Sequence, residues 1–119
     1  MPLELSLSKV DSITVATLKG TIVAGADKDL LLSKIRELLD AGETRIILDM
    51  GQVNYVDSTG IGGLVHLHTT AKQMGAAIKL FNLTKRIHDV LQITRLSTVF
   101  GIYADLQDAI ASFEAGAGA

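Results

Sequence analysis

Hydrophobic and polar residues alternate near the start of the chain and predict a β-hairpin. From Leu3 to Leu7 every second residue is a leucine and the residues between are polar, which is typical of a half-buried strand. Residues 13–18 are rich in β-branched side chains and predict a second strand. Asp11-Ser12 lies between them and has the composition of a turn. Residues 20–23 are expected to add a short strand.

The next two segments predict a helix and then a buried strand. Apolar side chains in residues 27–41 recur at helical spacing on one face, and Gly42 follows as a natural helix end. Residues 45–50 carry consecutive apolar side chains instead of an alternation. That pattern favours a central strand covered on both faces, so strand, helix and strand are expected to form one right-handed crossover unit.

The remainder predicts further helices and strands of a single α/β domain. Helices are expected over residues 58–74 and 84–94 and after a capping Asp105, and strands over 77–81 and 98–103. In the helix over 58–74, Met74 is placed on the apolar face, while His66, Thr69 and Gln73 fall on a face that meets water. We expect the domain to span residues 1–114, followed by a flexible, low-complexity tail over 115–119.

Composition narrows the classes of function. The 119 residues include no cysteine, so neither a disulfide nor a cysteine-based metal site is available. The net charge is −2 with both signs mixed along the chain, so no basic footprint for a nucleic acid is present. The start lacks the pattern of a secretory signal, and no apolar run reaches the ~18 residues of a membrane span. The chain is therefore expected to be cytoplasmic, with no membrane partner.

The chain contains no convincing catalytic, cofactor or metal motif. His66 and His68 are two residues apart, which points them to different faces of a helix, and His88 lies elsewhere in the sequence. The glycines at 60, 62 and 63 lack the full spacing of a dinucleotide-binding loop, and no P-loop lysine follows them. We therefore interpret these glycines as close packing at a helix start, and we predict that the protein is not an enzyme.

The segment over residues 53–63 carries the most informative chemistry. An apolar run ends in Asp57-Ser58-Thr59-Gly60, and the amphipathic helix follows directly. All three of the polar residues suit an N-cap, so the segment is expected to present a hydroxyl at a helix N-terminus. Free N–H groups and the helix dipole favour a negative group there. By composition alone, Ser58 is interpreted as a plain capping residue.

The run from Tyr55 to Gly62, together with the strand before it, resembles the signature of the STAS domain family and, more narrowly, of the bacterial anti-sigma factor antagonists. Other parts of the resemblance follow in the same order, over residues 79–86, 90–96 and 99–100. The resemblance covers the chain from about Leu3 to Phe113. It implies an α/β fold with a mixed sheet of four to five strands and about four helices.

The resemblance also implies a phosphorylation switch at Ser58. The matching serine in the family is phosphorylated by an anti-sigma factor that is itself a serine kinase. The unphosphorylated antagonist binds that kinase, which releases its sigma factor, and a PP2C-type phosphatase removes the phosphate. The partner-binding residues expected here are Asp57, Ser58, Thr59, Gly60, Gly62 and His66.

One segment departs from the family pattern, and two other functions stay open at this point. After Gly20 many relatives carry an acidic segment that helps to form the partner surface, whereas this chain has Thr21-Ile22-Val23-Ala24-Gly25. The first alternative is a STAS subunit of a stress-signalling or lipid-transport assembly that uses no phospho-switch. The second is a small enzyme or nucleotide-binding protein.

Overall fold

The computed structural model describes residues 2–117, with side chains described as far as Phe113. Within this range one mixed sheet has the strand order β1-β2-β3-β4-β5. Strand β1 is antiparallel to β2, and the other neighbours are parallel. The strands are β1 (Glu4–Val10), β2 (Ile13–Ile22), β3 (Arg45–Val56), β4 (Ala77–Phe81) and β5 (Gly101–Tyr103).

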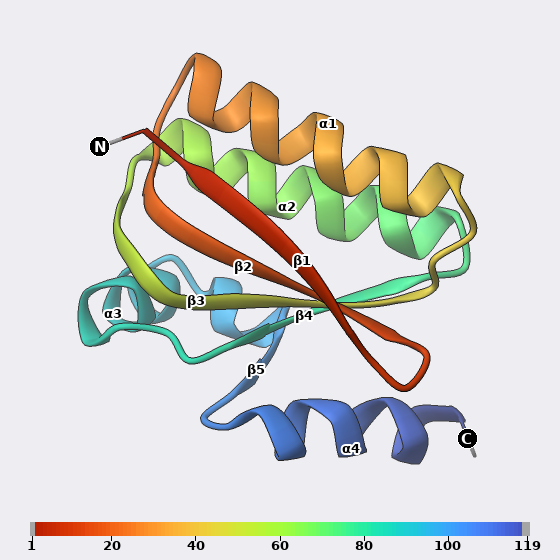
Figure 1. Ribbon diagram of the computed structural model, residues 1–119. Coiled ribbons are helices and arrows are strands. Elements are labelled where there is room, and N and C mark those ends of the chain that lie inside the picture. The colour runs from red at the N-terminus through yellow and green to blue at the C-terminus, as the bar shows by residue number, and fades with distance from the viewer. Residues whose placement is uncertain (1, 118–119) are drawn as a thin grey trace.

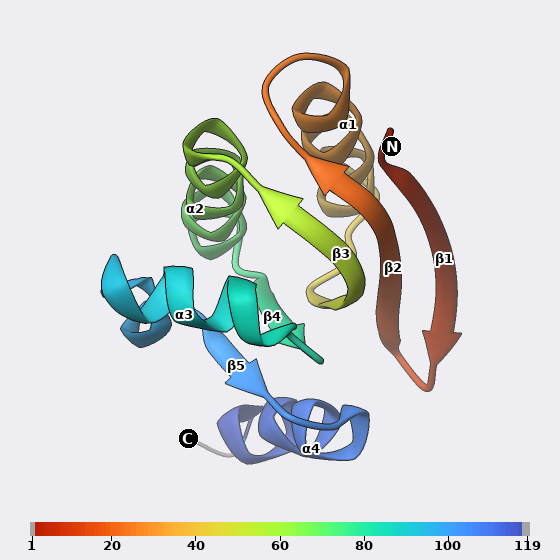
Figure 2. The ribbon, with the colours of Figure 1, turned by 90° about the vertical axis from the view of Figure 1, so that its left-hand side faces the viewer.

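Helices cover both faces of the sheet, as Figures 1 and 2 show. The helices are α1 (Ala26–Asp40), α2 (Ser58–Gln73), α3 (Lys85–Ile93) and α4 (Leu106–Ala117), with a 3₁₀ turn η1 (Leu96–Thr98) before β5. Helices α1 and α2 lie side by side on one face, and α4 lies against the other. The predicted α/β class is confirmed, with five strands and four helices in the described residues.

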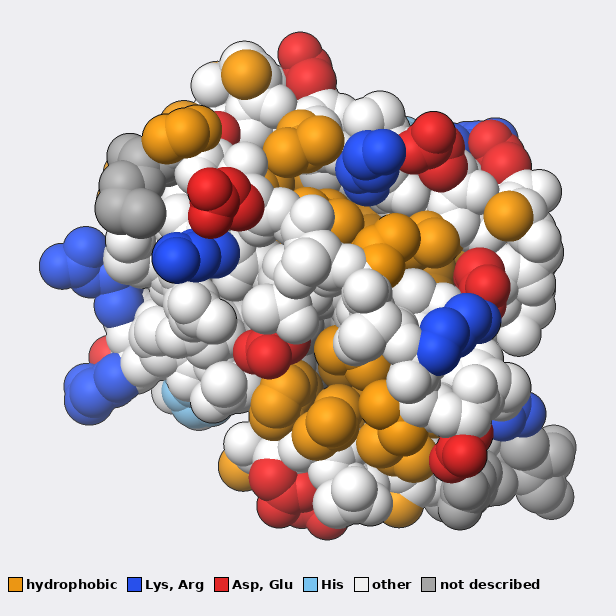
Figure 3. All heavy atoms as spheres, in the orientation of Figure 1, with side chains coloured by type: hydrophobic (Ala, Val, Ile, Leu, Met, Phe, Trp, Pro, Cys, Tyr) orange, Lys and Arg blue, Asp and Glu red, His pale blue; other side chains and the backbone are white. Residues whose placement is uncertain are grey.

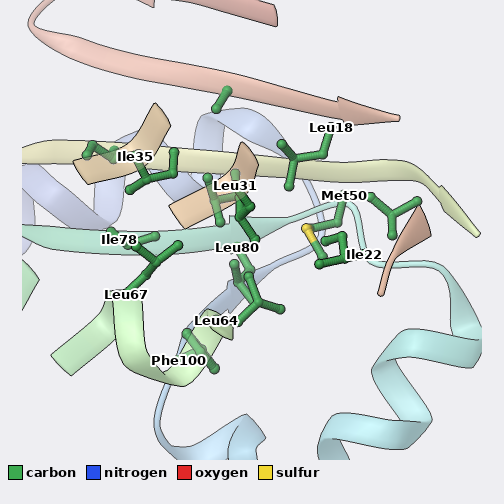
Figure 4. Close-up of a cluster of buried hydrophobic side chains, with 14 of the residues drawn as sticks. Leu18, Ile22, Leu31, Ile35, Met50, Leu64, Leu67, Ile78, Leu80 and Phe100 are labelled. Atoms are coloured by element: carbon green, nitrogen blue, oxygen red, sulfur yellow. The ribbon is translucent and has the colours of Figure 1, made fainter. Parts of the chain in front are cut away.

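Strand β3 is buried on both faces, as its consecutive apolar residues predicted. Ile46, Leu48 and Met50 belong to the main core beneath α1 and α2, part of which Figure 4 shows. Ile47 points the other way and packs with Ile110 in a smaller core beneath α4. All four of these β3 side chains are fully buried, so a single strand anchors both layers of helices.

Several predicted boundaries hold, and one predicted pair of strands is a single strand. Gly42 follows the end of α1 with a φ of +91°, which suits a glycine helix stop. Asp105 accepts a hydrogen bond from the Asp108 N–H (2.9 Å), the contact expected of a capping residue. Residues 13–18 and 20–23 were predicted as two strands, but β2 runs unbroken to Ile22. It tolerates Gly20 at a φ of +108° next to register shifts in its pairing with β3.

Three other expectations are wrong in detail. The predicted strand over 98–103 is only β5, because Arg95 adopts a left-handed conformation that starts η1 just before it. Met74 and Leu7 were predicted to face the core, but both are exposed. Met74 is the residue at which α2 ends, beyond the part of the helix that covers the sheet. Leu7 lies on β1, at the edge of the sheet.

Helix α4 extends to Ala117, past the predicted domain boundary at residue 114. Residues 118–119 of the predicted flexible tail lie outside the described residues, so the flexibility of the tail stays a prediction. No helix in the described part of the chain combines the length and hydropathy needed to cross a bilayer. The same part holds no group of three or more histidine and acidic residues arranged to bind a metal ion.

Candidate functional site

Ser58 is the first residue of α2, and Asp57 is the residue that caps this helix. Strand β3 runs to Val56, and Asp57 follows it in an extended conformation (φ −87°, ψ 178°). The Oδ1 atom of Asp57 accepts a hydrogen bond from the N–H of Gly60 at 2.7 Å. The interpretation of Ser58 as the capping residue is therefore wrong. Ser58 is exposed, and its hydroxyl makes no hydrogen bond to any described residue.

Asp57 also connects the site to the loop between β2 and α1. Its Oδ2 atom accepts from the N–H of Ala24 (3.0 Å), and its own N–H donates to the carbonyl oxygen of Ile22 (3.3 Å). The hydrogen bond from Gly60, followed by that from Ala24, lowers the pKa of Asp57 below its ordinary value, and Lys28 contributes more weakly. The carboxylate is therefore ionised at neutral pH, directly beside Ser58.

Gly60 is required where the first turn of α2 meets the end of β2. A Cβ atom at this position would collide with the carbonyl oxygen of Ile22 and would lie 2.9 Å from Cγ1 of Val56. The packing interpretation is thus confirmed for Gly60, which is buried. At Gly63 a Cβ atom would make only ordinary contact, 3.4 Å from Cγ of Lys28.

The packing interpretation is wrong for Gly62, because a Cβ atom there would have nothing within 4 Å, whereas its predicted role in partner binding stays a prediction. The residue is exposed one helical turn beyond Ser58, so its missing side chain leaves the hydroxyl unscreened on that side. Packing therefore does not explain this glycine. The geometry instead fits a surface that another molecule could approach closely.

The structure brings most of the predicted site residues onto one surface. Ser58, Gly62 and His66 are exposed and follow one another at intervals of four residues along α2, and Thr59 is exposed beside them. Asp57 is half-buried at the helix start. Gly60 is buried underneath and supports this surface from inside.

His66 lies further along the same surface, on the rim of a groove of about 330 Å³ between α1 and α2. Leu32 and Leu67 contribute apolar side chains to this groove, and Asp29 and Arg36 contribute charges. As predicted, His66 and His68 occupy different faces of α2. His68 packs edge-on against Phe100, with their ring centroids 5.3 Å apart.

A small apolar hollow that was not predicted from the sequence lies beside the first turn of α2. It measures about 40 Å³ and is lined by Tyr55, Val56, Ile61, Arg86, Ile87 and Val90. Tyr55 is 46% exposed, whereas the other four aromatic side chains of the described residues are buried or half-buried. Its position just before the Asp-Ser-Thr-Gly run was the available signal. The hollow adds apolar surface next to the hydroxyl.

Asp27 has a structural role that was not predicted from the sequence. It is 7% exposed, and its carboxylate accepts from the Leu3 N–H (2.9 Å), the Thr21 hydroxyl (2.7 Å) and the Val23 N–H (3.3 Å). One carboxylate thus fixes the start of β1, the end of β2 and the first turn of α1. Together with Asp57, it holds the loop over residues 23–25 from both sides.

The arrangement presents a hydroxyl at the surface, and none of the described residues is placed to activate it. No histidine among the described residues bonds to Ser58, and the neighbouring carboxylate is engaged with backbone N–H groups. The unbonded hydroxyl stands at a helix N-terminus, where an added anion is electrostatically favoured.

Comparisons with known proteins agree with this description. The STAS domain family matches residues 4–109. The Bordetella bronchiseptica protein BtrV is 25% identical over 112 residues, covering 94% of this chain and 96% of BtrV. The anti-sigma-B factor antagonist of Bacillus subtilis is 36% identical over 76 residues, covering 63% of this chain and 68% of that protein.

Solved structures share the fold. The unphosphorylated form of the anti-sigma factor antagonist SpoIIAA has a TM-score of 0.70 at 19% identity, covering 93% of this chain and 98% of SpoIIAA. The phosphorylated form of SpoIIAA, from Bacillus, has a TM-score of 0.71 at 20% identity, covering 92% and 99%. With its matched family signature, its mixed sheet and its exposed serine at the start of α2, this chain belongs to the STAS domain family.

Proposed function

We propose that this protein is an anti-sigma factor antagonist switched by phosphorylation of Ser58. In its unphosphorylated form it binds an anti-sigma factor that is also a serine kinase, and the bound sigma factor is released. Phosphorylation of Ser58 by that kinase ends the interaction, and a PP2C-type phosphatase restores it in the cytoplasm. The observation that carries this proposal is the exposed, unbonded hydroxyl at the first position of α2.

The proposed interface combines apolar contact with an open approach to the hydroxyl. Gly62 leaves space around Ser58, and the hollow next to Tyr55 and Ile61 offers apolar area to a partner side chain. The loop at Ala24, held by Asp57, borders the same surface. Tyrosines and small apolar pockets are frequent centres of binding energy in protein interfaces.

A phosphate on Ser58 should act on the complex and leave the fold intact. It adds about −1.5 to −2 charges, and the helix N-terminus stabilises such a group by about 0.3–1 kcal/mol. The Asp57 carboxylate next to it opposes part of this gain. At an interface, an added like charge or an unpaired buried charge costs several kcal/mol. Because each ~1.4 kcal/mol changes affinity tenfold, a penalty of about 3–4 kcal/mol lowers affinity more than a hundredfold.

Binding of the cognate anti-sigma factor to Ser58 variants tests the proposal. Ser58→Ala is expected to bind persistently, because it cannot be phosphorylated, and Ser58→Asp is expected to bind poorly. Gly62→Gln is a third variant, which should weaken binding while folding normally, because its side chain extends into open space. Equal affinities for the wild type, Ser58→Ala and Ser58→Asp would defeat the switch.

Incubation with the kinase and ATP, followed by mass spectrometry of the peptide that contains residues 57–60, tests the modification itself. A single added phosphate on Ser58, absent from Ser58→Ala, is the expected result. Far-UV circular dichroism of the modified protein should match that of the unmodified protein. Binding without any modification would instead favour a STAS subunit of a stress-signalling or lipid-transport assembly that has no phospho-switch.

A further inference from the structure

Strand β1 forms a regular edge of the sheet. It pairs with β2 alone, and no other described residue pairs with its outer side. The pairing runs without a bulge over all seven residues, from Glu4 opposite Lys19 to Val10 opposite Ile13. Soluble proteins commonly protect such an edge with a bulge, a proline or an inward-pointing charge. Within β1 there is no bulge and no proline. Lys9 is a charge on the same face as Leu5 and Leu7, but it lies near the end of the strand and pairs with Glu43, so the middle of the edge stays open.

The backbone groups on the outer side of β1 belong to alternate residues. The two-residue turn makes Val10 and Ile13 a hydrogen-bonded pair. Counting back in steps of two, Ser8, Ser6 and Glu4 also direct their N–H and C=O groups to β2. The N–H and C=O groups of Leu5, Leu7 and Lys9 therefore point to the open side. These are the groups that another strand would bond.

Apolar side chains accompany this open edge on the face that carries α1. Leu7 is 49% exposed, and Leu5, Leu30 and Leu38 are only partly buried beside the main core. Figure 3 shows hydrophobic side chains in the middle of this face, in the region between α1 and β1. A strand added at the edge would cover Leu7.

We infer that the open edge of β1 pairs antiparallel with the same edge of a second copy of this chain, joining two sheets into one of ten strands. A two-fold axis perpendicular to the sheet keeps equivalent side chains on one face, so odd-numbered residues must oppose odd-numbered residues. Centring the pair on Ser6 places Leu5 opposite Leu7 of the second copy, and Leu7 opposite Leu5 of the second copy.

This register also avoids repulsion between charged side chains. Glu4 lies opposite Ser8 of the second copy, and Lys9 lies opposite Leu3, so no like charges face each other directly. The two Leu5–Leu7 pairs fall on residues whose backbone groups point outward. At the Leu3–Lys9 pair the Leu3 N–H already donates to Asp27, so only the Lys9 N–H is available for a new hydrogen bond. Because the same edge supplies both sides of the contact, a second copy can bond the open N–H and C=O groups of β1 without any other protein.

The dimer leaves the Ser58 surface free. Strand β1 and helix α2 lie on opposite sides of the molecule in Figure 2. The inference therefore does not rest on the proposed function, and either can fail without the other. Centred on Ser6, only residues 4–8 of β1 oppose the same strand of the second copy. Such a short pair buries less than the ~800 Å² per partner of stable complexes, so a dissociation constant of about 10 µM to about 1 mM is expected.

Sedimentation equilibrium of the full chain from about 1 µM to about 1 mM tests the inference. The wild type should approach twice the mass of one chain as concentration rises. Leu7→Lys places a charge on the paired face and should raise the dissociation constant at least about tenfold. Ile93→Lys is the matched control: Ile93 is 82% exposed on α3, away from the edge, and its substitution should leave the dimer unchanged.

Hydrogen exchange provides a second measurement that needs no variant. The amides of Leu5, Leu7 and Lys9 should gain protection as protein concentration rises, whereas those of Ser6 and Ser8 are already bonded to β2 and should change little. A chain that stays monomeric up to about 1 mM would overturn the inference. A dimer weakened by Ile93→Lys and insensitive to Leu7→Lys would overturn it as well.

Discussion

The carboxylate of Asp57 holds the backbone N–H of Ala24 at 3.0 Å while it caps α2 through Gly60 at 2.7 Å. One side chain therefore fixes two segments that are far apart in sequence, the loop after β2 and the first turn of α2. Ser58 lies between these attachments, so its position depends on both. Ala24 contributes only its backbone N–H to the contact, so the contact does not depend on the side chain at this position.

Asp57→Asn should weaken the hydrogen bond to Ala24, in the loop after β2, more than the hydrogen bond to Gly60 that caps α2. An amide side chain has a single acceptor oxygen, so it can serve one of the two N–H groups and presents a donor to the other. We expect faster hydrogen exchange at the Ala24 amide, with the Gly60 amide less affected, and a lower denaturation midpoint. Asp29→Asn is the control, because it removes the same charge from an exposed residue in the first turn of α1. Equal exchange at Ala24 in both variants would contradict this account.

Gly60→Ala and Gly62→Ala should change stability in opposite directions. The added methyl at position 60 meets the Ile22 carbonyl, which is backbone and cannot move aside, so a loss of about 1–3 kcal/mol is expected. At position 62 the methyl meets open space, and the higher helix propensity of alanine should add about 0.5–1 kcal/mol. Urea denaturation of the pair measures both values. A similar loss at the two positions would show that the first turn of α2 packs differently.

Asp27→Asn should destabilise the fold by about 1–3 kcal/mol at neutral pH, because it disturbs three hydrogen bonds to a buried carboxylate. The hydrogen bond from Leu3 and, after it, that from Thr21 lower the pKa of Asp27 below its ordinary 3.8, against the opposing effect of burial. A lowered folded-state pKa gives stability that is complete above pH 3.8 and is lost as pH falls through the folded-state value.

Urea denaturation at neutral and acidic pH measures this effect. The difference between wild type and Asp27→Asn should be constant above about pH 5 and should shrink below pH 3.8. Asp40→Asn serves as the control, since Asp40 pairs with Arg36 on the exposed side of α1. A difference that stays constant into strong acid would mean that the carboxylate is not the stabilising group.

The sequence predicted correctly those features that depend on the pattern of residues close together in the chain. The consecutive apolar residues 45–50 form a buried strand and a helix begins at Ser58, both as expected, although β3 continues to Val56, six residues beyond its predicted end. The sequence could not decide which of Asp57, Ser58 and Thr59 caps the helix, because all three have suitable side chains. The choice depends on a tertiary contact, the hydrogen bond from the Asp57 N–H to Ile22 on another strand.

The roles of Asp27 and the two glycines could not be predicted for the same reason, because they depend on contacts with residues far away in the sequence. An acidic residue in a first helical turn normally indicates compensation of the helix dipole. The burial of Asp27 follows from Leu3, which is 24 residues away in sequence. Gly60 and Gly62 are nearly adjacent and look alike in the sequence, but only Gly60 lies against β2. Residue spacing carries no information about which helix face a distant strand will touch.

His68 should make stability depend on pH near neutrality. Its Nδ1 atom is buried and has no hydrogen-bond partner among the described residues, and its ring packs on Phe100. Burial, and to a smaller extent the charge of Lys72 on the same helix, lower the pKa of His68 below its ordinary 6.5. The unfolded chain therefore takes up a proton before the folded chain does, so stability is complete above pH 6.5 and falls as pH drops below it.

His68→Phe tests this dependence because it keeps a ring against Phe100 and removes the titrating group. Urea denaturation from about pH 8 to about pH 5 should give a midpoint that declines below pH 6.5 in the wild type and a flatter profile in the variant. His66→Gln, an exposed histidine on the same helix, should keep the slope of the wild type. If His68→Phe and the wild type lose stability in parallel, protonation at this ring does not control the packing of α2 against Phe100.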